Sequence, residues 1–544
     1  MAVIVNSVQP FDDQRPGTSG LRKSTRRFME PGYLEAFLQA ILEADPPGDD
    51  ASLIVGGDGR FFGREAAETV IRMAAAAGYG RVRVGRGALL STPAASHLVR
   101  TTGAQGAIIL SASHNPGGPD GDFGVKYNTR SGGPAPESLT EEIFARSRGI
   151  SAWRIETQGT LDLDRPGETR IGQTVVEVID PVVAHADLLE SLFDFDAIRA
   201  LLAGGFRMRF DAMHAVTGPY AVDLFERRLC APPGTVINAV PRPDFGGGHP
   251  DPHPDHAPEL MAALSGPDSC DFGAASDGDG DRNMIVGPDG FVVSPGDSLA
   301  ILTALADRVP GYATGVRGVA RSLPTSRAAD RVAAALGVPC HVTPTGWKWF
   351  TSLMDDGRIT LCGEESFGTG SDHVREKDGL WAVLFWLNLL AVEGVGVREL
   401  VTRHWRQYGR DAFRREDYEA LDSAVAATFM AELQARVASA VGTDLGGFQV
   451  KAARDFAYVD PVDGARAQGQ GIELTLSPDA RITYRLSGTG SSGATLRVYL
   501  ERFIAPDGEV EGALMPLLEP LSAASRTFAE VEARLGRTAP SVVT

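Results

Sequence analysis

Up to about residue 370, stretches with apolar residues at helical spacing alternate with short, unbroken apolar runs. Residues 64–77 carry a helical stripe, and residues 81–84 form a short apolar run typical of a strand. A further helix begins at Pro93 and ends at Gly103, and a buried strand follows at 106–110. Helices that alternate with short apolar strands predict an α/β architecture.

The same alternation continues through the middle of the chain. The expected elements are a strand at 272–275, a helix capped by Asp297 and ending at Arg308, a helix capped by Ser326 and ending before Gly337, and a strand at 359–362. Three of the predicted strands lead into polar loops, at 111–118, 277–282 and 363–368. Open α/β sheets bind ligands at the carboxyl ends of their strands, so these loops are the first places to look for a site.

Beyond the basic stretch at 406–415 the pattern changes. A long helix is expected at 416–441, followed by β-rich segments at 472–476 and 481–486. This arrangement favours a smaller α+β domain at the C-terminal end of the chain.

A chain of 544 residues is too long for one hydrophobic core. We therefore expect an α/β protein of four domains, with three related α/β domains that have mixed sheets and a smaller C-terminal α+β domain. The predicted domains are residues 1–184, 185–298, 299–410 and 411–544.

Composition narrows the possible partners. Hydrophobic residues make up 43% and charged residues 22% of the chain, as in ordinary globular proteins. The formal net charge of −18 disfavours a nucleic-acid partner, which usually requires a basic face. The four cysteines are scattered without CxxC spacing, which is typical of reduced thiols.

No segment predicts secretion or a membrane span. Residues 2–5 are too short for the apolar region of a signal peptide. The most apolar stretch, 380–392, is interrupted by Asn388 and is shorter than a span requires, so a buried core helix is expected there. A cytoplasmic protein without a membrane partner is the resulting prediction.

Asp277, Asp279 and Asp281 alternate with glycines directly after a predicted strand. Carboxylates at this spacing can converge on one Mg²⁺, which prefers hard oxygen ligands. An EF-hand calcium loop does not fit, because its sixth position would be Arg282 rather than Gly and its twelfth Pro288 rather than Glu. A solvated acidic turn is the alternative without a metal.

Ser113 lies in a Ser-His-Asn-Pro-Gly-Gly loop after another predicted strand. Serines in such turns usually only cap local backbone groups, and there is no G-x-S-x-G elbow here. His114 is expected to be structural rather than a general base, because adjacent side chains rarely point at the same atom. The combination of a hydroxyl nucleophile with a divalent-cation site is nevertheless what phosphoryl transfer requires.

Residues 485–493 read Arg-Leu-Ser-Gly-Thr-Gly-Ser-Ser-Gly and satisfy G-x-G-x-x-G formally. The segment that follows, 494–500, is expected to be a strand rather than a helix, so a dinucleotide site is not supported. Hydroxyls and backbone amides flanked by Arg485 and Arg497 suit a phosphate monoester. A flexible Gly/Ser turn is the alternative.

Two more groups have polar chemistry. Glu364 and Ser366 offer a carboxylate and a hydroxyl suited to sugar hydroxyls, although adjacent acids are often only surface residues. His249, His253 and His256 raise the possibility of zinc, but they lie among four prolines, and a loop with incidental histidines is the favoured interpretation.

Taken together, eight segments resemble the α-D-phosphohexomutase superfamily, and specifically its phosphoglucomutase branch. They are 18–23, 111–118, 122–128, 277–282, 344–348, 363–368, 376–379 and 485–493. Each is modest evidence alone, but they occur in family order over nearly the whole chain, so the resemblance is specific.

The resemblance implies four domains around a central cleft and an isomerase that interconverts glucose 1-phosphate and glucose 6-phosphate. Ser113 would be carried as a phosphoserine, and one Mg²⁺ per chain would be held by Ser113, Asp277, Asp279 and Asp281. Glucose 1,6-bisphosphate would be the intermediate and the activator. It would turn around in the site before its other phosphate returns to Ser113.

The resemblance also implies the remaining roles. Arg22 and Arg282 would offset negative charge, and Lys126 would be the acid/base, with a pKa lowered by crowded cations. The sugar would be bound by Thr345, Gly346, Glu364, Ser366 and Lys377. The non-reacting phosphate would be bound by Arg485, Ser487, Gly488, Thr489, Gly490, Ser491 and Arg497.

Substrate preference and rival functions follow from the same loops. Glu364-Glu365-Ser366-Phe367 is similar to the glucose-preferring branch, so mannose 1-phosphate is expected to react weakly. A non-catalytic structural paralogue would show losses at the serine, the aspartates or the sugar loop, and none is visible. A metal-dependent sugar phosphatase using Ser113 is the other alternative. The family expectation is a monomer whose partner is a phosphosugar.

Overall fold

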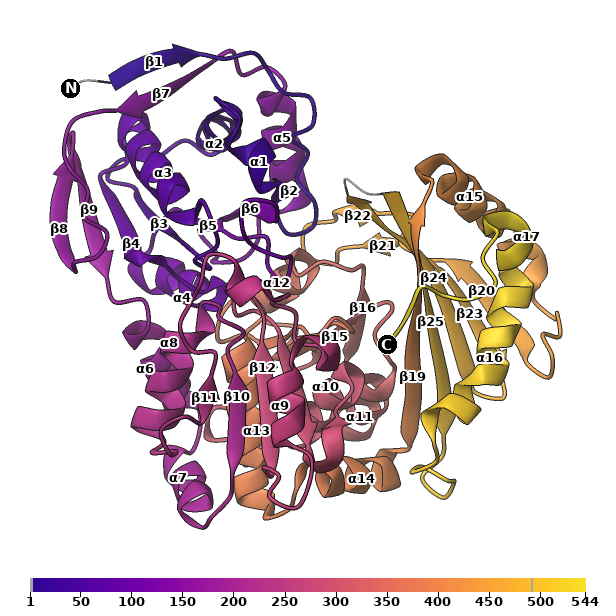
Figure 1. Cartoon of the computed structure of the whole chain (residues 1–544). Coiled ribbons are helices and arrows are strands. Elements are labelled where there is room, and N and C mark those ends of the chain that lie inside the picture. Colours follow the sequence, from indigo (N-terminus) through magenta and orange to yellow (C-terminus); the bar gives the residue numbers. More distant parts are fainter. Residues whose placement is uncertain (1–2, 491–492) are drawn as a thin grey trace. The chain divides into compact units, whose positions relative to one another are not determined.

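The computed structural model describes residues 3–490 and 493–544, with only the backbone described at 488–490. The chain, whose elements are labelled in Figure 1, divides into two compact units, each assembled from several segments of the sequence. The first unit consists of Met1–Val293, Leu305–Gly318 and Gly346–Arg398. The second unit consists of Ser294–Ala304, Val319–Thr345 and Glu399–Thr544.

The largest sheet of the first unit has seven strands and is mixed. Its order is β2 (Leu21–Ser24), β6 (Asp122–Asn128), β5 (Gly106–Leu110), β3 (Ser52–Gly57), β4 (Arg81–Leu89), β9 (Thr174–Ile179) and β8 (Gly167–Ile171). The four central strands β5, β3, β4 and β9 are parallel, whereas the strands outside them pair antiparallel.

Helices surround this sheet because their apolar stripes are buried against it. They are α1 (Thr25–Phe28), α2 (Tyr33–Ala44), α3 (Gly63–Ala77), α4 (Thr92–Thr102) and α5 (Glu137–Ser147). The predicted helix at 64–77, the strand at 106–110 and the helix ending at Gly103 are confirmed. A separate antiparallel ribbon joins β1 (Val3–Ser7) to β7 (Ala152–Glu156).

A second mixed sheet of the first unit has five strands. Its order is β11 (Val236–Ile237), β10 (Met208–Asp211), β12 (Phe272–Ser276), β13 (Asn283–Gly287) and β14 (Phe291–Val292). The helices of this region are α6 (Val183–Leu192), α7 (Phe195–Ala203), α8 (Thr217–Ala221), which continues as a π-helix at Val222–Arg228, and α9 (Pro258–Ala263). The strand predicted at 272–275 is confirmed.

The later segments of the first unit supply a short hairpin and a core helix. They contain α12 (Lys348–Asp355), β17 (Leu361–Gly363), β18 (Thr369–Ser371) and α13 (Gly379–Glu393). All residues of α13 from Gly379 to Leu390 are buried, as expected for a core helix. Over residues 3–490 and 493–544, no single helix is long and apolar enough to cross a membrane, and α13 with α14 (Val397–Tyr408) meets those criteria only as a pair bent by 81°.

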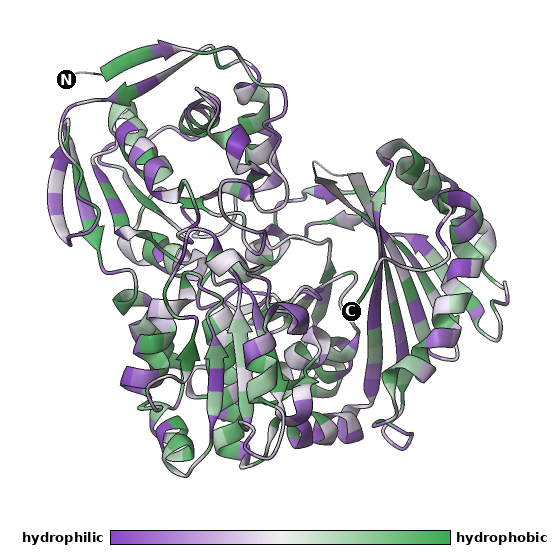
Figure 2. Cartoon of the chain, viewed as in Figure 1, coloured by the Kyte–Doolittle hydropathy of each residue, from purple (hydrophilic) through white to green (hydrophobic). Residues whose placement is uncertain are grey.

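The second unit is built on an antiparallel sheet of six strands. Its order is β20 (Gln449–Asp455), β23 (Ile472–Ser477), β24 (Ala480–Gly490), β25 (Gly493–Ile504), β19 (Arg410–Leu421) and β26 (Val542–Val543). Hydrophobic and hydrophilic residues alternate along its long strands (Figure 2), as expected when the two faces of a sheet differ in burial.

The helices of the second unit include α15 (Ser423–Ala440), α16 (Leu514–Ala529) and α17 (Val531–Leu535), which contribute to the core of this sheet. The unit also contains α10 (Pro295–Ala304), α11 (Ala328–Leu336) and the parallel strands β15 (Val319–Ser322) and β16 (Cys340–Thr343).

The helix predicted at 416–441 is wrong in its first part. Residues 410–421 form β19, and the helix begins only after Asp422, whose side chain accepts hydrogen bonds from the amides of Ala424 and Val425. The charged residues of β19 are paired at two-residue spacing, Arg414 with Glu416 and Arg415 with Asp417. Residues two apart lie on the same face of a strand, so the first pair lies on one face of β19 and the second pair on the other. This pairing on both faces accommodates a charged segment in a strand.

Asp297 does not cap its helix. Ser294 precedes α10, accepts a hydrogen bond from the Asp297 amide at 3.1 Å and donates to the Asp297 carboxylate at 2.8 Å. The residue in the capping position is therefore the serine, and Asp297 lies in the first turn. The helix ends at Ala304, short of the predicted Arg308.

Ser326 lies one residue further from its helix than predicted. The helix α11 begins at Ala328 with Arg327 in the capping position, and the Ser326 hydroxyl accepts from the Ala328 amide at 3.4 Å. Its predicted end before Gly337 is confirmed, because Gly337 has the left-handed backbone of a helix C-cap.

Candidate functional site

Ser113 lies just beyond the carboxyl end of β5 and is only 1% exposed. Its backbone is left-handed, with φ of 55°, a conformation that non-glycine residues seldom adopt. The Ser113 amide donates to the Ser111 hydroxyl at 2.7 Å, and the Ser113 carbonyl accepts from the Arg60 guanidinium at 2.8 Å. These bonds hold the backbone of Ser113 on both sides.

A buried ion pair supports the serine loop from the neighbouring strand β3. Asp58 and Arg60 follow β3 and are fully buried, with 2.8 Å between carboxylate and guanidinium. Asp58 also accepts from the Ser111 hydroxyl at 2.6 Å. Our sequence reasoning missed this pair, although charged residues directly after a buried strand next to β5 were the available signal.

The Asp277 loop lies against the serine loop. It follows β12, and the Ser113 hydroxyl donates to Asp277 Oδ2 at 2.8 Å. Asp277 Oδ1 accepts from the amides of Asp281 and Arg282 at 2.9 and 3.0 Å, so the carboxylate closes its own loop. Two loops that are 164 residues apart in the sequence therefore meet at one hydroxyl and one carboxylate.

The three aspartates form a buried set of oxygen ligands. Asp277, Asp279 and Asp281 each offer an oxygen within 4.8 Å of the others, and all are 0–1% exposed. Among the described residues, Oδ1 of Asp279 and Oδ1 of Asp281 have no hydrogen-bond partner. Burial and the two neighbouring carboxylates raise the pKa of Asp277 well above its usual value. The unpartnered carboxylate oxygens, and the repulsion between the three carboxylates, fit the binding of a divalent cation such as Mg²⁺.

Lys126 contacts this set from β6. Its ammonium group forms an ion pair with Asp279 and lies 3.4 Å from Asp281. The predicted lowering of its pKa by crowded cations is wrong. Burial does lower the pKa of Lys126, but Asp279, Asp281 and Glu376 together raise it above the usual value of a lysine. The sequence prediction considered the cations and neglected the carboxylates.

Two arginines border the same set. Arg22 lies on β2, and burial lowers its pKa, with Asp279 acting in the opposite direction. Arg282 ends the Asp277 loop, with its guanidinium 3.4 Å from Asp251 and 3.9 Å from Asp277. Within the described residues, the Nε of each arginine is buried without a hydrogen-bond partner. Both arginines therefore have donor capacity left for an anion.

The predicted sugar residues are brought together only in part. Glu364 follows β17, is 5% exposed and accepts from the Gly346 amide at 3.1 Å. Lys377 lies 3.3 Å from Asp281, which joins this region to the aspartates. Ser366 is half-buried in the turn between β17 and β18. Thr345 belongs to the second unit.

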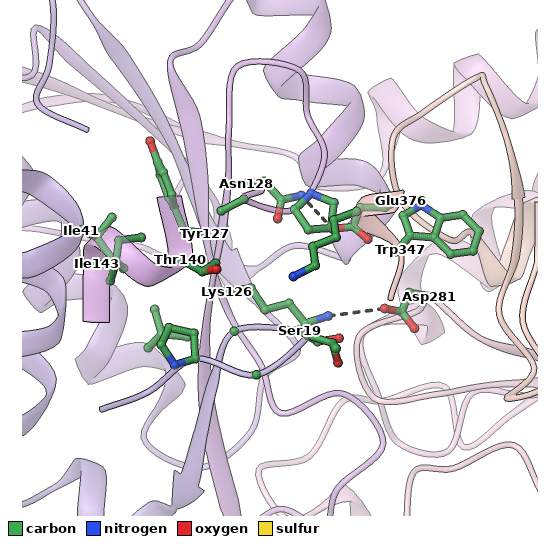
Figure 3. Close-up of a pocket in the computed structure, with 18 of the residues that line it drawn as sticks. Ser19, Ile41, Lys126, Tyr127, Asn128, Thr140, Ile143, Asp281, Trp347 and Glu376 are labelled. Carbon is green, nitrogen blue, oxygen red and sulfur yellow. Dashed lines mark hydrogen bonds and ion pairs between the residues drawn. The ribbon is translucent and has the colours of Figure 1, made fainter. Parts of the chain in front are cut away.

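A pocket lies beside Lys126 in the first unit (Figure 3). Ser19, Asp281 and Trp347 are among the residues that line it. Glu376 also lines it and accepts from Asn128 at 2.9 Å, and burial raises the pKa of Glu376 to about 7. Our sequence reasoning gave Glu376 no role, although it is in the resemblance segment 376–379.

The predicted phosphate residues lie on two paired strands of the second unit. Arg485 on β24 is directly opposite Arg497 on β25, and Ser487 is opposite Thr495. Two arginines directly opposite each other repel, and this repulsion is offset in part because Arg497 lies 3.6 Å from the Asp417 carboxylate. Gly488, Thr489 and Gly490 lie at the end of β24, where only the backbone is described, and Ser491 lies outside the described residues. The strand expected after this loop is confirmed by β25.

Four family models match nearly the whole chain. Phosphoglucomutase/phosphomannomutase α/β/α domains I, II and III match residues 13–152, 184–290 and 295–408. The C-terminal domain of phosphoglucomutase-1 matches residues 410–541. The expected four-domain fold, with three α/β domains and a C-terminal domain, is thereby confirmed, whereas the exact boundaries that we proposed stay predictions.

Full-length relatives decide the family. A phosphoglucomutase of Rhizobium radiobacter is 53% identical over 536 residues, which cover 98% of both chains. The chain belongs to the phosphoglucomutase family. Human phosphoglucomutase-1 is 45% identical to this chain over 560 residues, which cover 100% of both chains. The resemblance to the α-D-phosphohexomutase superfamily and the prediction of an isomerase are confirmed.

A solved structure agrees with this family. The Paramecium exocytosis-sensitive phosphoprotein pp63/parafusin, a phosphoglucomutase in its open form, is 41% identical. It has a TM-score of 0.91 and covers 100% of this chain and 99% of its own. The phosphoglucomutase family thus accounts for both the sequence and the fold along the full length of the chain.

Proposed function

We propose that this enzyme interconverts glucose 1-phosphate and glucose 6-phosphate through a phosphoserine at Ser113, with Mg²⁺ as its metal and glucose 1,6-bisphosphate as its intermediate. The observation that carries the proposal is the contact of 2.8 Å between the Ser113 hydroxyl and Asp277, inside the buried aspartate set. The names of the full-length relatives support glucose phosphates as substrates.

Ser113, Asp277, Asp279 and Asp281 would hold the Mg²⁺. The ion would supply positive charge that neutralises the phosphoryl oxygens during transfer. The unpartnered oxygens of Asp279 and Asp281, among the residues described, support this ligand set. A phosphoseryl group adds about two negative charges to the three carboxylates, so Arg22 and Arg282 are proposed to offset the remainder.

In the proposed transfer, the bond between phosphorus and Ser113 Oγ breaks while a bond forms between phosphorus and the sugar hydroxyl oxygen. The hydroxyl proton must end on Ser113 Oγ. Lys126 is our candidate to carry it, because its ammonium form is held by Asp279 and Asp281 and can give one proton while accepting another. In the reverse half-reaction, the same groups act on the other phosphate of the bisphosphate.

The sugar is proposed to contact Gly346, Glu364, Ser366 and Lys377 of the first unit, and the role of Thr345 stays a prediction from the resemblance. The buried Glu364 carboxylate next to Lys377 supports hydrogen bonds to sugar hydroxyls. The non-reacting phosphate is proposed to lie against Arg485, Ser487 and Arg497 and the loop that joins their strands. The pairing of Arg485 with Arg497 supports this role.

Phosphorus NMR tests the proposal directly. The purified protein is mixed with Mg²⁺, glucose 1-phosphate and a trace of glucose 1,6-bisphosphate, and Ser113→Ala is measured in parallel. Ser439→Ala, which removes an exposed serine from α15, is the matched control. We expect glucose 6-phosphate from the parent and from Ser439→Ala, and none from Ser113→Ala.

The other outcomes have defined meanings. Release of inorganic phosphate without the isomer would identify a sugar phosphatase. A parent protein that is folded and phosphorylated but inert would point to a structural paralogue. Equal rates on mannose 1-phosphate and glucose 1-phosphate would contradict the glucose preference predicted from the Glu364 loop.

A further inference from the structure

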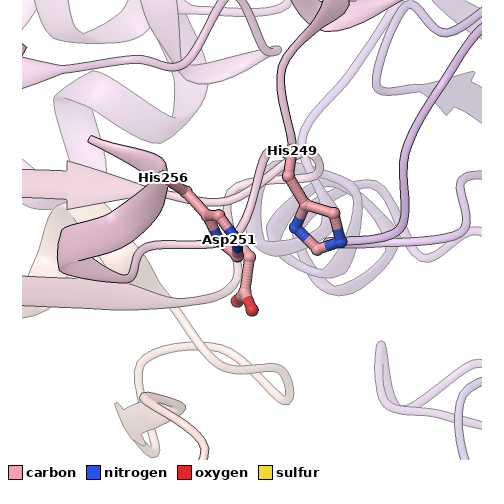
Figure 4. A group of neighbouring side chains, drawn as sticks. All are labelled: His249, Asp251 and His256. Atoms are coloured by element: carbon pink, nitrogen blue, oxygen red, sulfur yellow. The ribbon is translucent and has the colours of Figure 1, made fainter. Parts of the chain in front are cut away.

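The loop between β11 and α9 contains the three histidines that the sequence interpretation left as incidental. In the structure, two of them converge. The imidazole rings of His249 and His256 have their centres 4.4 Å apart, with an angle of 35° between the ring planes. Asp251 lies beside them, and the three residues each offer a ligand atom within 4.8 Å of the others (Figure 4).

The loop is held in place by its own backbone. The amide of Asp251 donates to the carbonyl of His249 at 2.9 Å, and the amide of His256 donates to the carbonyl of His253 at 2.9 Å. The Gly278 amide donates to the Pro250 carbonyl at 3.1 Å, which fixes the loop to the Asp277 loop. A loop with these bonds presents the three side chains from a defined backbone rather than from a flexible linker.

One ring nitrogen of His249 is positioned to bind a metal ion. Its Nδ1 is buried and, among the described residues, has no hydrogen-bond partner. Burial removes the hydrogen bonds that a ring nitrogen makes with water. This costs free energy unless another group or a metal ion binds the nitrogen. His256 is exposed and has room to turn towards a bound ion.

His253 is different, although it lies in the same loop. Its Nδ1 accepts from the Asp255 amide at 3.3 Å and lies 3.6 Å from the Asp255 carboxylate. This histidine caps the short 3₁₀ turn at Pro254–His256, and it is not one of the three converging residues. It therefore provides a natural control.

We propose that His249, Asp251 and His256 form a second metal site, for a divalent transition metal such as Zn²⁺. Two imidazoles and one carboxylate are a ligand set that such ions prefer, whereas Mg²⁺ prefers oxygen ligands alone. Ligand atoms around a tetrahedral Zn²⁺ are roughly 3.3 Å apart, given its ligand bond lengths. The present spacing, within 4.8 Å, is wider than that value, so the exposed His256 would have to turn inward when the metal binds.

The chemistry separates this site from the aspartate set. Asp277, Asp279 and Asp281 offer only oxygen, and the histidine site offers two nitrogens and one oxygen. The two sites are nevertheless neighbours, because Asp251 lies 3.4 Å from Arg282, whose guanidinium is 3.9 Å from Asp277. A metal test must therefore tell the two sites apart.

The experiment uses the full chain with Mg²⁺ in large excess and measures metal binding rather than turnover. Zn²⁺ is titrated by calorimetry, and Co²⁺ is followed by its visible absorption, which reports its ligands. We expect one Zn²⁺ or Co²⁺ per chain beyond the Mg²⁺. His256→Ala should weaken this binding by roughly 100-fold, because loss of a direct ligand costs at least as much as loss of a supporting group.

Two further variants complete the test. His253→Asn, which keeps a side-chain acceptor for the Asp255 amide, should bind as the parent does, and Asp281→Asn, which removes a carboxylate from the aspartate set, should keep the cobalt absorption. The proposal is overturned if the parent binds no Zn²⁺ in excess Mg²⁺, or if His256→Ala binds as tightly as the parent. It is also overturned if Asp281→Asn alone abolishes the cobalt signal. Thermal unfolding of each metal-free variant checks that it is folded.

Discussion

Each of the two units buries a group of charged side chains, and the two groups differ in how they are paired. In the second unit, Arg481 and Arg327 bind the two oxygens of Glu501 at 2.6 and 2.7 Å, and Arg331 binds both oxygens of Asp411. We call this group the arginine cluster. Burial raises the pKa of Glu501, but Arg481, Arg327 and Arg321 bring it down to about 2. Burial and the charge of Glu501 raise the pKa of Asp411 to about 7, against the effect of Arg331.

The aspartate set of the first unit is paired only in part, by Lys126 with Asp279 and Asp281 and by Lys377 with Asp281. Three carboxylates lie together, and within the part of the chain that the structure describes, two of their oxygens have no partner. A fully paired buried cluster needs no further partner, whereas a partly paired cluster loses stability unless a ligand binds its remaining polar atoms. The difference teaches that unpaired buried charge, rather than buried charge itself, indicates a site for chemistry.

The strongest test of this contrast is Asp277→Asn. We expect turnover to fall about 1,000-fold, since a metal ligand and its charge are removed. Stability should stay equal or rise, because the substitution relieves the repulsion that raises the pKa of Asp277. Rates are measured with glucose 1-phosphate and Mg²⁺, and stability by urea unfolding of the metal-free proteins, with the exposed Asp196→Asn as control. Retained activity, or a clear loss of stability, would contradict the contrast.

Arg481→Met should have the reverse profile. It leaves Glu501 and Glu473 buried without this partner, which should destabilise the protein by about 3–5 kcal/mol. Turnover of the folded fraction at low temperature should be unchanged, since the arginine cluster is assigned no chemistry. Urea unfolding and rates are compared with Arg466→Met, which alters an exposed arginine. An unchanged unfolding midpoint would show that the cluster contributes no stability.

His404 on α14 provides a third test, because the pKa of this buried histidine is shifted by burial rather than by a neighbouring charge. Burial lowers its pKa from 6.5 to about 4, so the unfolded chain takes up a proton in this range before the folded protein does. Stability is therefore complete above pH 6.5 and is lost as pH falls towards 4, by up to about 3 kcal/mol. In His404→Phe, the free energy of unfolding should differ less between pH 6.5 and pH 4 than it does in the parent. An identical pH dependence in parent and variant would contradict this.

Removal of Mg²⁺ should have the smallest effect. At a free concentration of 100 times its Kd, Mg²⁺ should stabilise the parent by about 2.7 kcal/mol. Chelation should lower the unfolding midpoint of the parent and of Arg481→Met equally, and should leave Asp277→Asn nearly unaffected. Calorimetric unfolding with and without chelator measures this. A metal effect that survives in Asp277→Asn would place the ion elsewhere.

Local sequence was enough to predict the two loops that meet at the candidate site. Ser113 and Asp277 each follow a short apolar strand, and strands of this type were recognisable without tertiary information. The charged pair Asp58 and Arg60 was recognisable at the end of its strand, but its contact with the Ser113 loop was not, because that contact joins residues more than 50 positions apart. The pKa of Lys126 was predicted wrongly for the same reason, since its direction depends on which distant carboxylates come close.

The C-terminal part shows the same limit. Charged residues at 410–421 have no apolar period by which a strand could be recognised, and their partners lie on β25 and within β19 itself. The convergence of His249 and His256 also depends on the turn between them rather than on their spacing. Sequence thus predicts which groups are present at a strand end, and tertiary contacts decide which of them meet.

The assembly of each unit from separate segments has a consequence for recombination. The segment matched by the third domain model, 295–408, contributes α10, α11 and β15 to the second unit and α12 and α13 to the first. A chimera of two relatives joined at residue 410 would therefore combine a foreign sheet with native helices inside one compact unit. If Ser294–Ala304, Val319–Thr345 and Glu399–Thr544 are exchanged together, the sheet and helices of the second unit come from the same parent. Such a hybrid should therefore fold better than one made by exchanging a single continuous stretch of the gene.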